Sequence, residues 1–169
     1  MVKALLAAGF HVTAISRESS TSTFPAGVEV RKADLSSTES LTKAFAGQDA
    51  VVSTVATVAA LGEQQPITDA ALAAGVKRLI PSEFGHNTQT LSDPTLAKML
   101  GGKTVALEYI IKKAEENPGF TWTGLSTSMF FDWVSDHGNL FSSSFTQTAK
   151  QMPLTRGSRA LTTDHGTST

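Results

Sequence analysis

The chain has 169 residues, of which 40% are hydrophobic, with 14 Lys and Arg against 15 Asp and Glu and a formal net charge of -1. This length suits one domain with a core of ordinary size. The balanced, interspersed charge excludes the basic footprint of a protein that binds nucleic acid or a membrane surface. There is no cysteine, which excludes disulfides, thiolate metal sites and cysteine nucleophiles and fits a cytoplasmic protein.

Helix-like and strand-like segments alternate along the chain. The first residues carry a brief apolar stretch after Lys3, which predicts a short helix ending at Gly9 and neither a signal peptide nor a membrane span. Later helices are marked by a capping box of Ser36 and Glu39, and by Asp93 before a proline. We predict helices at 2–8, 36–47, 64–74 and 93–116, the last loosened at 101–102, and strands at 10–15, 28–32, 50–55, 76–80 and 120–125.

This alternation predicts an α/β fold with a doubly wound parallel sheet, of the nucleotide-binding Rossmann-like kind. Ligands of such sheets bind at the carboxyl ends of the strands. The polar loop 81–85, Pro-Ser-Glu-Phe-Gly, follows a short apolar strand, so Ser82, Glu83 and Phe84 are placed to touch a ligand. The usual strand and Gly-rich turn that hold a pyrophosphate are expected just before Val2 and are not in the sequence.

Several segments together resemble the NmrA-like, isoflavone-reductase-like family of atypical short-chain dehydrogenases. The loop Pro-Ser-Glu-Phe-Gly is the most specific of these segments, and the likeness covers roughly residues 4–133. The matching segments are 8–17 (Ala-Gly-Phe-His-Val-Thr-Ala-Ile-Ser-Arg), 33–35 (Ala-Asp-Leu), 49–54 (Asp-Ala-Val-Val-Ser-Thr), 74–85 and 128–133 (Ser-Met-Phe-Phe-Asp-Trp).

The resemblance implies NADP(H) binding and, in reductase members, hydride transfer to a small aromatic substrate. Other members are NADP-sensing regulators without turnover, which would act through a protein partner. A third alternative is a fragment that cannot bind the cofactor. On this basis residues 1–133 are expected to be a cofactor-binding domain that is incomplete at its N-terminus. Residues 134–169, rich in Ser and Thr, are expected to be the partly disordered start of an incomplete substrate-binding portion.

Arg17 lies at the end of the strand that follows the first helix. NAD-specific relatives of this fold place an acidic residue there, whereas a basic residue suits the 2′-phosphate of NADP. An arginine with three serines nearby can bind a phosphate dianion through bidentate, charge-assisted hydrogen bonds. The alternative is a solvated surface arginine at a strand end.

Lys103 falls on the apolar stripe of the long helix, near Leu100 and Leu107. A lysine in an apolar environment loses hydration of its ammonium, which favours acid/base chemistry. By the resemblance, Lys103 aligns with the catalytic lysine of the family. The alternative is a lysine at a helix start that extends its ammonium to water.

A second lysine pattern is a decoy. Tyr109 and Lys113 fit the Tyr-x-x-x-Lys pattern of typical short-chain dehydrogenases, but both project well off the apolar stripe. The better interpretation is that this two-residue pattern occurs by chance on the surface of the helix. If Lys103 takes the lysine position, the tyrosine position is Met99, which cannot donate a proton.

The remaining candidates line the predicted strand ends. Thr54 and Val55 are placed to approach the ribose and pyrophosphate, and Asp34 either lies near the adenine or caps a turn. Phe130 either forms an aromatic wall for the nicotinamide or substrate, or belongs to the core. The four histidines lack metal-ligand spacing, so no metal site is predicted.

Overall fold

A computed structural model of the chain describes residues 1–55, 57–90 and 92–127, with no side-chain description for 57–61 and 96. The described residues form two compact units, 1–14 with 23–29, and 15–22 with 30–127. The chain order is α1 (Val2–Ala7), β1 (Val12–Ser16), β2 (Val28–Lys32), α2 (Thr38–Phe45), β3 (Ala50–Val52), α3 (Thr57–Ala73), β4 (Arg78–Ile80), the short 3-10 helix η1 (Thr88–Thr90), α4 (Pro94–Glu116) and β5 (Thr121–Trp122).

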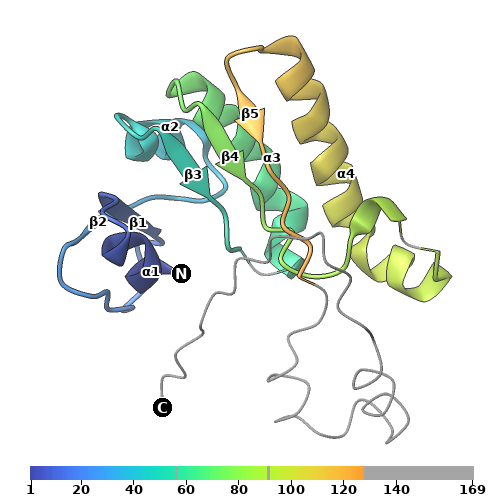
Figure 1. Cartoon of the computed structure of the whole chain (residues 1–169), viewed down its shortest axis with the longest axis horizontal. Coiled ribbons are helices and arrows are strands. Elements are labelled where there is room, and N and C mark those ends of the chain that lie inside the picture. The colour runs from blue at the N-terminus through green and yellow to red at the C-terminus, as the bar shows by residue number, and fades with distance from the viewer. Residues whose placement is uncertain (56, 91, 128–169) are drawn as a thin grey trace, which may run out of the picture. The chain divides into compact units, whose positions relative to one another are not determined.

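The larger unit contains a parallel sheet in the order β3-β4-β5. Val51 pairs with Leu79, and Leu79 with Trp122. Each parallel step is made by a crossover helix, α3 between β3 and β4 and α4 between β4 and β5 (Figure 1). Helix α3 contacts α2 and α4, and α4 also contacts β5. The predicted parallel α/β organisation is confirmed.

The core of this unit lies between the sheet and the helices. Leu41, Leu79 and Ile110 are its largest apolar side chains with almost no exposed surface, and they come from α2, β4 and α4. The α3 contribution is built from small residues, because Ala70 and Ala71 are completely buried. Small side chains on α3 allow neighbouring elements to approach it closely, and together with the buried Ile67 they form the apolar face of this helix.

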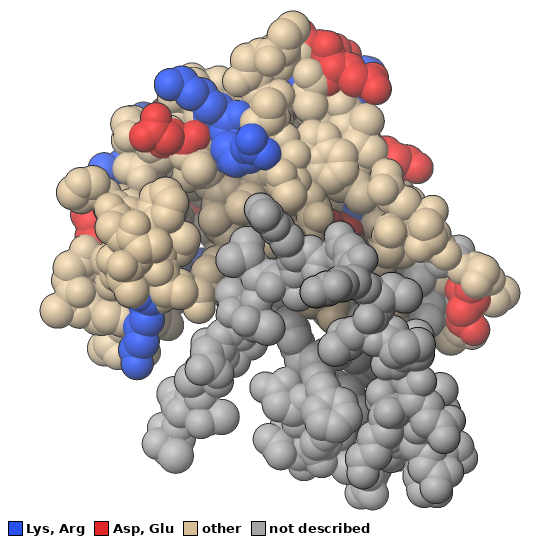
Figure 2. All heavy atoms as spheres, in the orientation of Figure 1, with Lys and Arg blue, Asp and Glu red and all other residues tan. Residues whose placement is uncertain are grey.

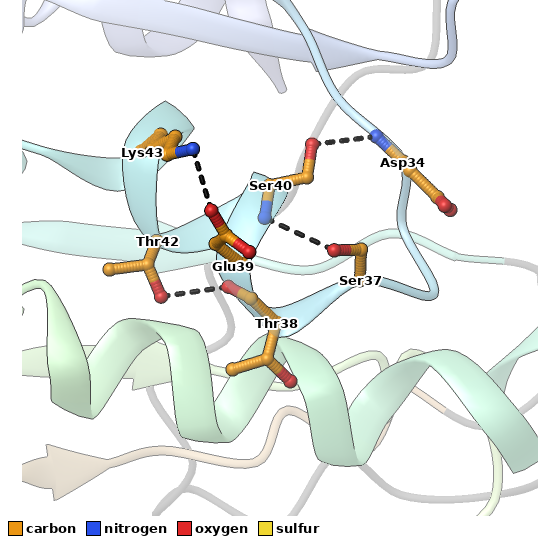
Figure 3. Close-up of polar contacts among 7 residues, drawn as sticks. All are labelled: Asp34, Ser37, Thr38, Glu39, Ser40, Thr42 and Lys43. Atoms are coloured by element: carbon orange, nitrogen blue, oxygen red, sulfur yellow. Dashed lines mark hydrogen bonds and ion pairs between the residues drawn. The ribbon is translucent and has the colours of Figure 1, made fainter.

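Helix α2 begins one residue later than its predicted capping box. Ser37 is the N-cap, and its side chain accepts a hydrogen bond from Ser40 N at 3.2 Å (Figure 3). Ser36 instead donates through its Oγ to Asp34 Oδ1 at 2.7 Å. The carboxylate of Glu39 pairs with Lys43 rather than with the backbone of the cap. The predicted box was therefore wrong, because the adjacent serine competes for the cap position.

Helix α3 is longer than predicted, and helix α4 is more regular than predicted. Helix α3 already begins at Thr57, and Pro66 lies inside it. The proline lacks an N–H and leaves the carbonyl of Gly62 without its helical donor, yet the helix continues. Helix α4 runs unbroken through Gly101 and Gly102, so the predicted loosening was wrong. Burial of the apolar face of α4 outweighs the propensity cost of two glycines, about 1 kcal/mol each.

The smaller unit holds α1 and most of the first strand. Helix α1 has no buried residue, and Phe10 just after it is 61% exposed. Strands β1 and β2 form a two-stranded sheet, and the side chain of Thr13 bonds Glu29 at 3.4 Å.

Charged side chains of both signs are dispersed among uncharged ones on the face shown in Figure 2. Among the described residues no helix has the length and hydropathy needed to span a membrane.

Candidate functional site

A cluster of buried polar groups lies at the carboxyl end of the parallel sheet. The loop 81–85 leaves β4 there, and Ser82 and Glu83 are both buried although both are polar. Glu83 N donates to Pro81 O at 2.8 Å, which makes a tight turn immediately after the strand. Buried polar side chains require partners, and in this loop three neighbouring elements supply them.

Ser82 is the hub of this cluster. Its Oγ donates to Val55 O at 2.7 Å, in the segment after β3, and its backbone N donates to Gln64 Oε1 of α3 at 3.4 Å. Its carbonyl accepts a hydrogen bond of 2.6 Å from Lys103 Nζ of α4. The loop is therefore tied to the segment after β3 and to both crossover helices.

Lys103 is 9% exposed, so its ammonium has been removed from most of the solvent. Leu100, Ala106 and Leu107 of the same helix are also buried, as predicted for the apolar stripe of α4. The short bond to a carbonyl holds the ammonium within the protein instead of extending it to water. Lys103 therefore does not extend its ammonium to water, which was the alternative expected from the sequence.

Glu83 is the acidic neighbour of this lysine. Its Oε2 accepts a hydrogen bond from Thr88 Oγ1 at 3.0 Å. Burial raises the pKa of the Glu83 carboxyl above its usual range, although the bond from Thr88 and the positive charge of Lys103 act in the opposite direction. The cluster thus contains a buried cation and a buried acid whose charge state depends on pH.

A cavity of about 260 Å³ opens beside Glu83 at the ends of β4 and β5. Its apolar walls are Leu107 and Trp122, and Gly124 forms part of its rim. A Cβ at Gly124 would lie 3.3 Å from Trp122 Cζ3, so a side chain there would crowd the cavity. The other lining residues are polar: Asn87, Gln89, Thr123 and Ser126.

Arg17 lies just after β1, with its side chain 60% exposed. Its Nη2 is 3.7 Å from Glu63 Oε1 of α3, an acidic partner that the sequence did not indicate. Gln64, the residue after Glu63, contacts the Ser82 loop. Helix α3 therefore connects the surroundings of Arg17 with those of Lys103.

The other predicted residues are less closely linked. Thr54 is exposed and Phe84 is partly buried. Asp34 is exposed and accepts hydrogen bonds from the N and Oγ of Ser36, which lower the pKa of its carboxyl; it thus caps a turn, one of the two roles expected for it. Phe130 lies outside the described residues.

The tyrosine pattern is likewise away from this cluster. Tyr109 OH donates to Asp69 Oδ1 of α3 at 2.6 Å, and Lys113 Nζ lies 3.9 Å from the same oxygen. Burial and the negative charge of Asp69 raise the pKa of Tyr109 to about 12. These side chains connect two helices, which explains the pattern without a catalytic role.

Gln64 was missed by the sequence interpretation, although the signal for it existed. It precedes Ile67 by three positions and Ala71 by seven, so it continues the apolar stripe of α3. Gln64 is 3% exposed. A polar residue on an apolar stripe is the same signal that singled out Lys103.

The parallel α/β layer and its polar strand ends define a Rossmann-like domain. The model of the NmrA-like family matches residues 1–157. The chain is 42% identical over 125 residues to oxidoreductase aprR of Aspergillus flavus, and 38% identical over 131 residues to oxidoreductase poxI of Penicillium oxalicum. These alignments cover 73% and 78% of this chain, and 41% of each relative. The chain belongs to the NmrA-like family.

Solved reductase structures share the fold of this chain. A complex of leucoanthocyanidin reductase with NADPH from Vitis vinifera superposes with a TM-score of 0.60 at 25% identity, covering 74% of this chain and 42% of that one. An isoflavone reductase structure superposes with a TM-score of 0.63 at 24% identity, covering 79% and 46%. The family resemblance predicted from the sequence is confirmed, and the chain spans less than half the length of these relatives.

Proposed function

We propose that this chain is the cofactor-binding part of an NADPH-dependent reductase that acts on a small aromatic substrate, with Lys103 as the general acid. The observation that carries the proposal is the buried ammonium of Lys103, which donates to Ser82 O at 2.6 Å at the carboxyl end of the sheet. Similarity to curated oxidoreductases and to a reductase solved with NADPH supports it. Residues 134–169 would belong to the substrate-binding portion.

The polar groups near the strand ends suit a polar cofactor. Among the described residues, only three buried side-chain atoms lack a hydrogen-bond partner: Ser53 Oγ, Glu63 Oε2 and Gln64 Nε2. All three belong to the end of β3 or to α3, the region between Arg17 and the Ser82 loop. Unpaired buried polar groups are costly, and a bound polar ligand would supply the missing partners.

In this proposal the cofactor is held by residues from five segments. Arg17 binds the 2′-phosphate, Thr54 and Val55 border the ribose and pyrophosphate, and Ser82 and Phe84 border the nicotinamide. Asp34 lies toward the adenine, and Phe130 would add an aromatic wall. NADPH supplies the hydride when it is bound.

Lys103 supplies the proton. Its ammonium is fixed by a backbone carbonyl, which cannot take the proton away, so one donor position is occupied and two remain for a substrate oxygen. A cation held in a water-poor site stabilises negative charge that develops on that oxygen as hydride arrives. The buried Glu83 nearby makes the field at Lys103 dependent on pH.

The cavity beside Glu83 offers a place for the aromatic substrate. Leu107 and Trp122 provide apolar contact for a ring, and amide and hydroxyl groups at the rim can bond ring hydroxyls. One solved structure of similar fold holds NADP⁺ and pinoresinol, and another similar protein is a eugenol synthase of Petunia hybrida. Phenolic compounds of this kind are therefore the first substrates to assay.

The test measures NADPH binding by calorimetry and NADPH oxidation with pinoresinol and with an isoflavone. We expect Lys103→Met to lower turnover by about 100-fold or more while the Kd of NADPH changes little. Lys112→Met, an exposed lysine of the same helix, is the matched control and should retain activity.

Turnover that is unchanged in Lys103→Met would contradict the role of this lysine. NADPH binding without turnover on any aromatic substrate would favour a redox-sensing regulator instead. A Gly124→Val variant separates substrate from cofactor: it should raise the KM of the substrate by crowding the cavity, with the Kd of NADPH unaffected.

A further inference from the structure

The ion pair of Arg17 with Glu63 joins the residue proposed for the 2′-phosphate to a carboxylate. Arg17 Nη2 and Glu63 Oε1 are 3.7 Å apart, and the two side chains are 60% and 20% exposed. The second oxygen of the carboxylate, Oε2, is buried and has no hydrogen-bond partner among the described residues. Glu63 thus places one oxygen near the arginine, while the other is buried without a partner and reaches a donor when the carboxylate turns about its soft terminal torsion.

A second cation, the ammonium of Lys32, holds the backbone at Arg17 in place. Lys32 Nζ, at the end of β2, donates to Arg17 O at 3.1 Å and to Ser20 O at 2.7 Å. Ser20 N in turn donates to Arg17 O at 3.0 Å. These hydrogen bonds hold the backbone of residues 17–20 in a turn. They thereby fix the position of the Arg17 backbone, from which the guanidinium extends toward Glu63.

A carboxylate and a phosphate compete for the same guanidinium. A 2′-phosphate dianion would take the bidentate bonds of Arg17, and the negative charge of Glu63 would then stand close to that phosphate and oppose it. An unphosphorylated ribose instead offers a 2′-hydroxyl, which can donate to the unpartnered Oε2. In Rossmann-like folds an acidic side chain that binds the ribose hydroxyls favours the unphosphorylated ribose, and Glu63 would bring such a group to the ribose from α3.

Building on the proposed function, we propose that Glu63 is a specificity-determining residue of the adenine-ribose site. Its carboxylate weakens the preference that Arg17 creates for a 2′-phosphate and accepts a hydrogen bond from a free 2′-hydroxyl. The site therefore accepts both phosphorylated and unphosphorylated nicotinamide dinucleotides. Pairs of this exposure contribute little to stability, so the ion pair is not required for the fold.

The test titrates the protein with two fragments of the cofactors, adenosine 2′,5′-bisphosphate and adenosine 5′-monophosphate, by calorimetry. In Glu63→Gln we expect the bisphosphate to bind about two- to fivefold more tightly, the scale of one partly exposed charge pair. The monophosphate should bind more weakly, because a neutral amide is a poorer acceptor than a carboxylate. The ratio of the two Kd values is the readout, and the gain for bisphosphate should shrink as salt is added.

Glu115→Gln is the matched control, because it removes the same charge from an exposed position of α4. The pair is also tested as a cycle: in an Arg17→Ala background, Glu63→Gln should favour the bisphosphate less than it does with Arg17 present, because only the direct charge repulsion is left to remove. A ratio unchanged by Glu63→Gln overturns this inference while the proposed reductase stands. Binding of neither nucleotide by the wild-type chain would contradict both.

Discussion

Helices α1 and α2 are both short, yet they are stabilised in different ways. In each, a leucine four positions after the N-cap makes the same bond: Leu5 N donates to Met1 O and Leu41 N to Ser37 O, both at 3.0 Å. Leu41 is completely buried, whereas α1 buries none of its residues. The two helices therefore share the same backbone hydrogen bond and differ in the packing that protects this bond from opening.

The two helices differ at their first turn as well. Ser37 caps α2 with its side chain, and Glu39 and Lys43 form a pair with a 2.7 Å contact along its exposed face (Figure 3). Met1 gives α1 no side-chain cap, and its first turn has no acidic residue. Since isolated helices of this length are marginal in water, α2 owes its persistence to tertiary burial, with local interactions adding smaller increments.

The sharpest test is the same substitution in both helices. Leu41→Ala should lower the free energy of unfolding by about 2–5 kcal/mol, because it leaves a cavity in the core. Leu5→Ala is the matched control and should cost less than about 1 kcal/mol. Urea denaturation followed by circular dichroism measures both. Equal costs would show that burial does not distinguish the two helices.

Amide exchange tests the two equivalent hydrogen bonds directly. The amide of Leu41 should exchange at least about tenfold more slowly than that of Leu5 after correction for sequence effects, because opening α2 must expose core surface. Hydrogen-exchange mass spectrometry or NMR resolves the two helices. Similar protection of both amides would remove packing as the cause.

Removing the cap should produce a smaller effect that is confined to α2. Ser37→Ala deprives Ser40 N of its acceptor and should cost about 1 kcal/mol of unfolding free energy. Ser37→Asp is the control, since aspartate is an equally good N-cap and its charge suits a helix N-terminus. If the aspartate variant is as destabilised as the alanine variant, the cap is not the source of the stability.

The smallest effect concerns Glu39. The hydrogen bond from Lys43, together with its positive charge, lowers the pKa of the Glu39 carboxyl below its usual 4.5. The folded state therefore gains stability that is present above that value and lost as the pH falls through the lowered pKa. Replacing Glu39 with Gln should flatten the part of the stability profile that lies below pH 4.5. Added salt should reduce the difference, whereas a profile identical to that of the wild type would show that the pair contributes nothing.

Sequence patterns predicted the order and type of the elements because the apolar spacing of α2, α4 and the strands reflects burial on one side. Ends and interruptions were harder to predict. The helix predicted at 64–74 begins at Thr57 in the structure, and its backbone accommodates Pro66. The N-cap of α2 was predicted one residue too early, because Ser36 and Ser37 are adjacent and either hydroxyl can cap a helix.

The candidate site was predictable where one residue type contradicted its surroundings. Lys103 on an apolar stripe was such a contradiction, and its burial is confirmed. Glu63 could not be found in this way, because an acidic residue on a helix is ordinary until tertiary structure brings Arg17 beside it. The link from Ser82 to Gln64 also depends on segments that are distant in sequence.

The parallel register of the sheet has a consequence for how the chain folds. Ala50 pairs with Arg78, 28 positions later (78 − 50), and Arg78 with Thr121, 43 positions later (121 − 78). No ladder bond can form until loops of those lengths have closed, which makes such pairing slow. Helices α3 and α4 occupy these loops and shorten the distance to be searched. We therefore expect the helices to gain structure before the strands pair, so that the three short strands are the last elements to become stable.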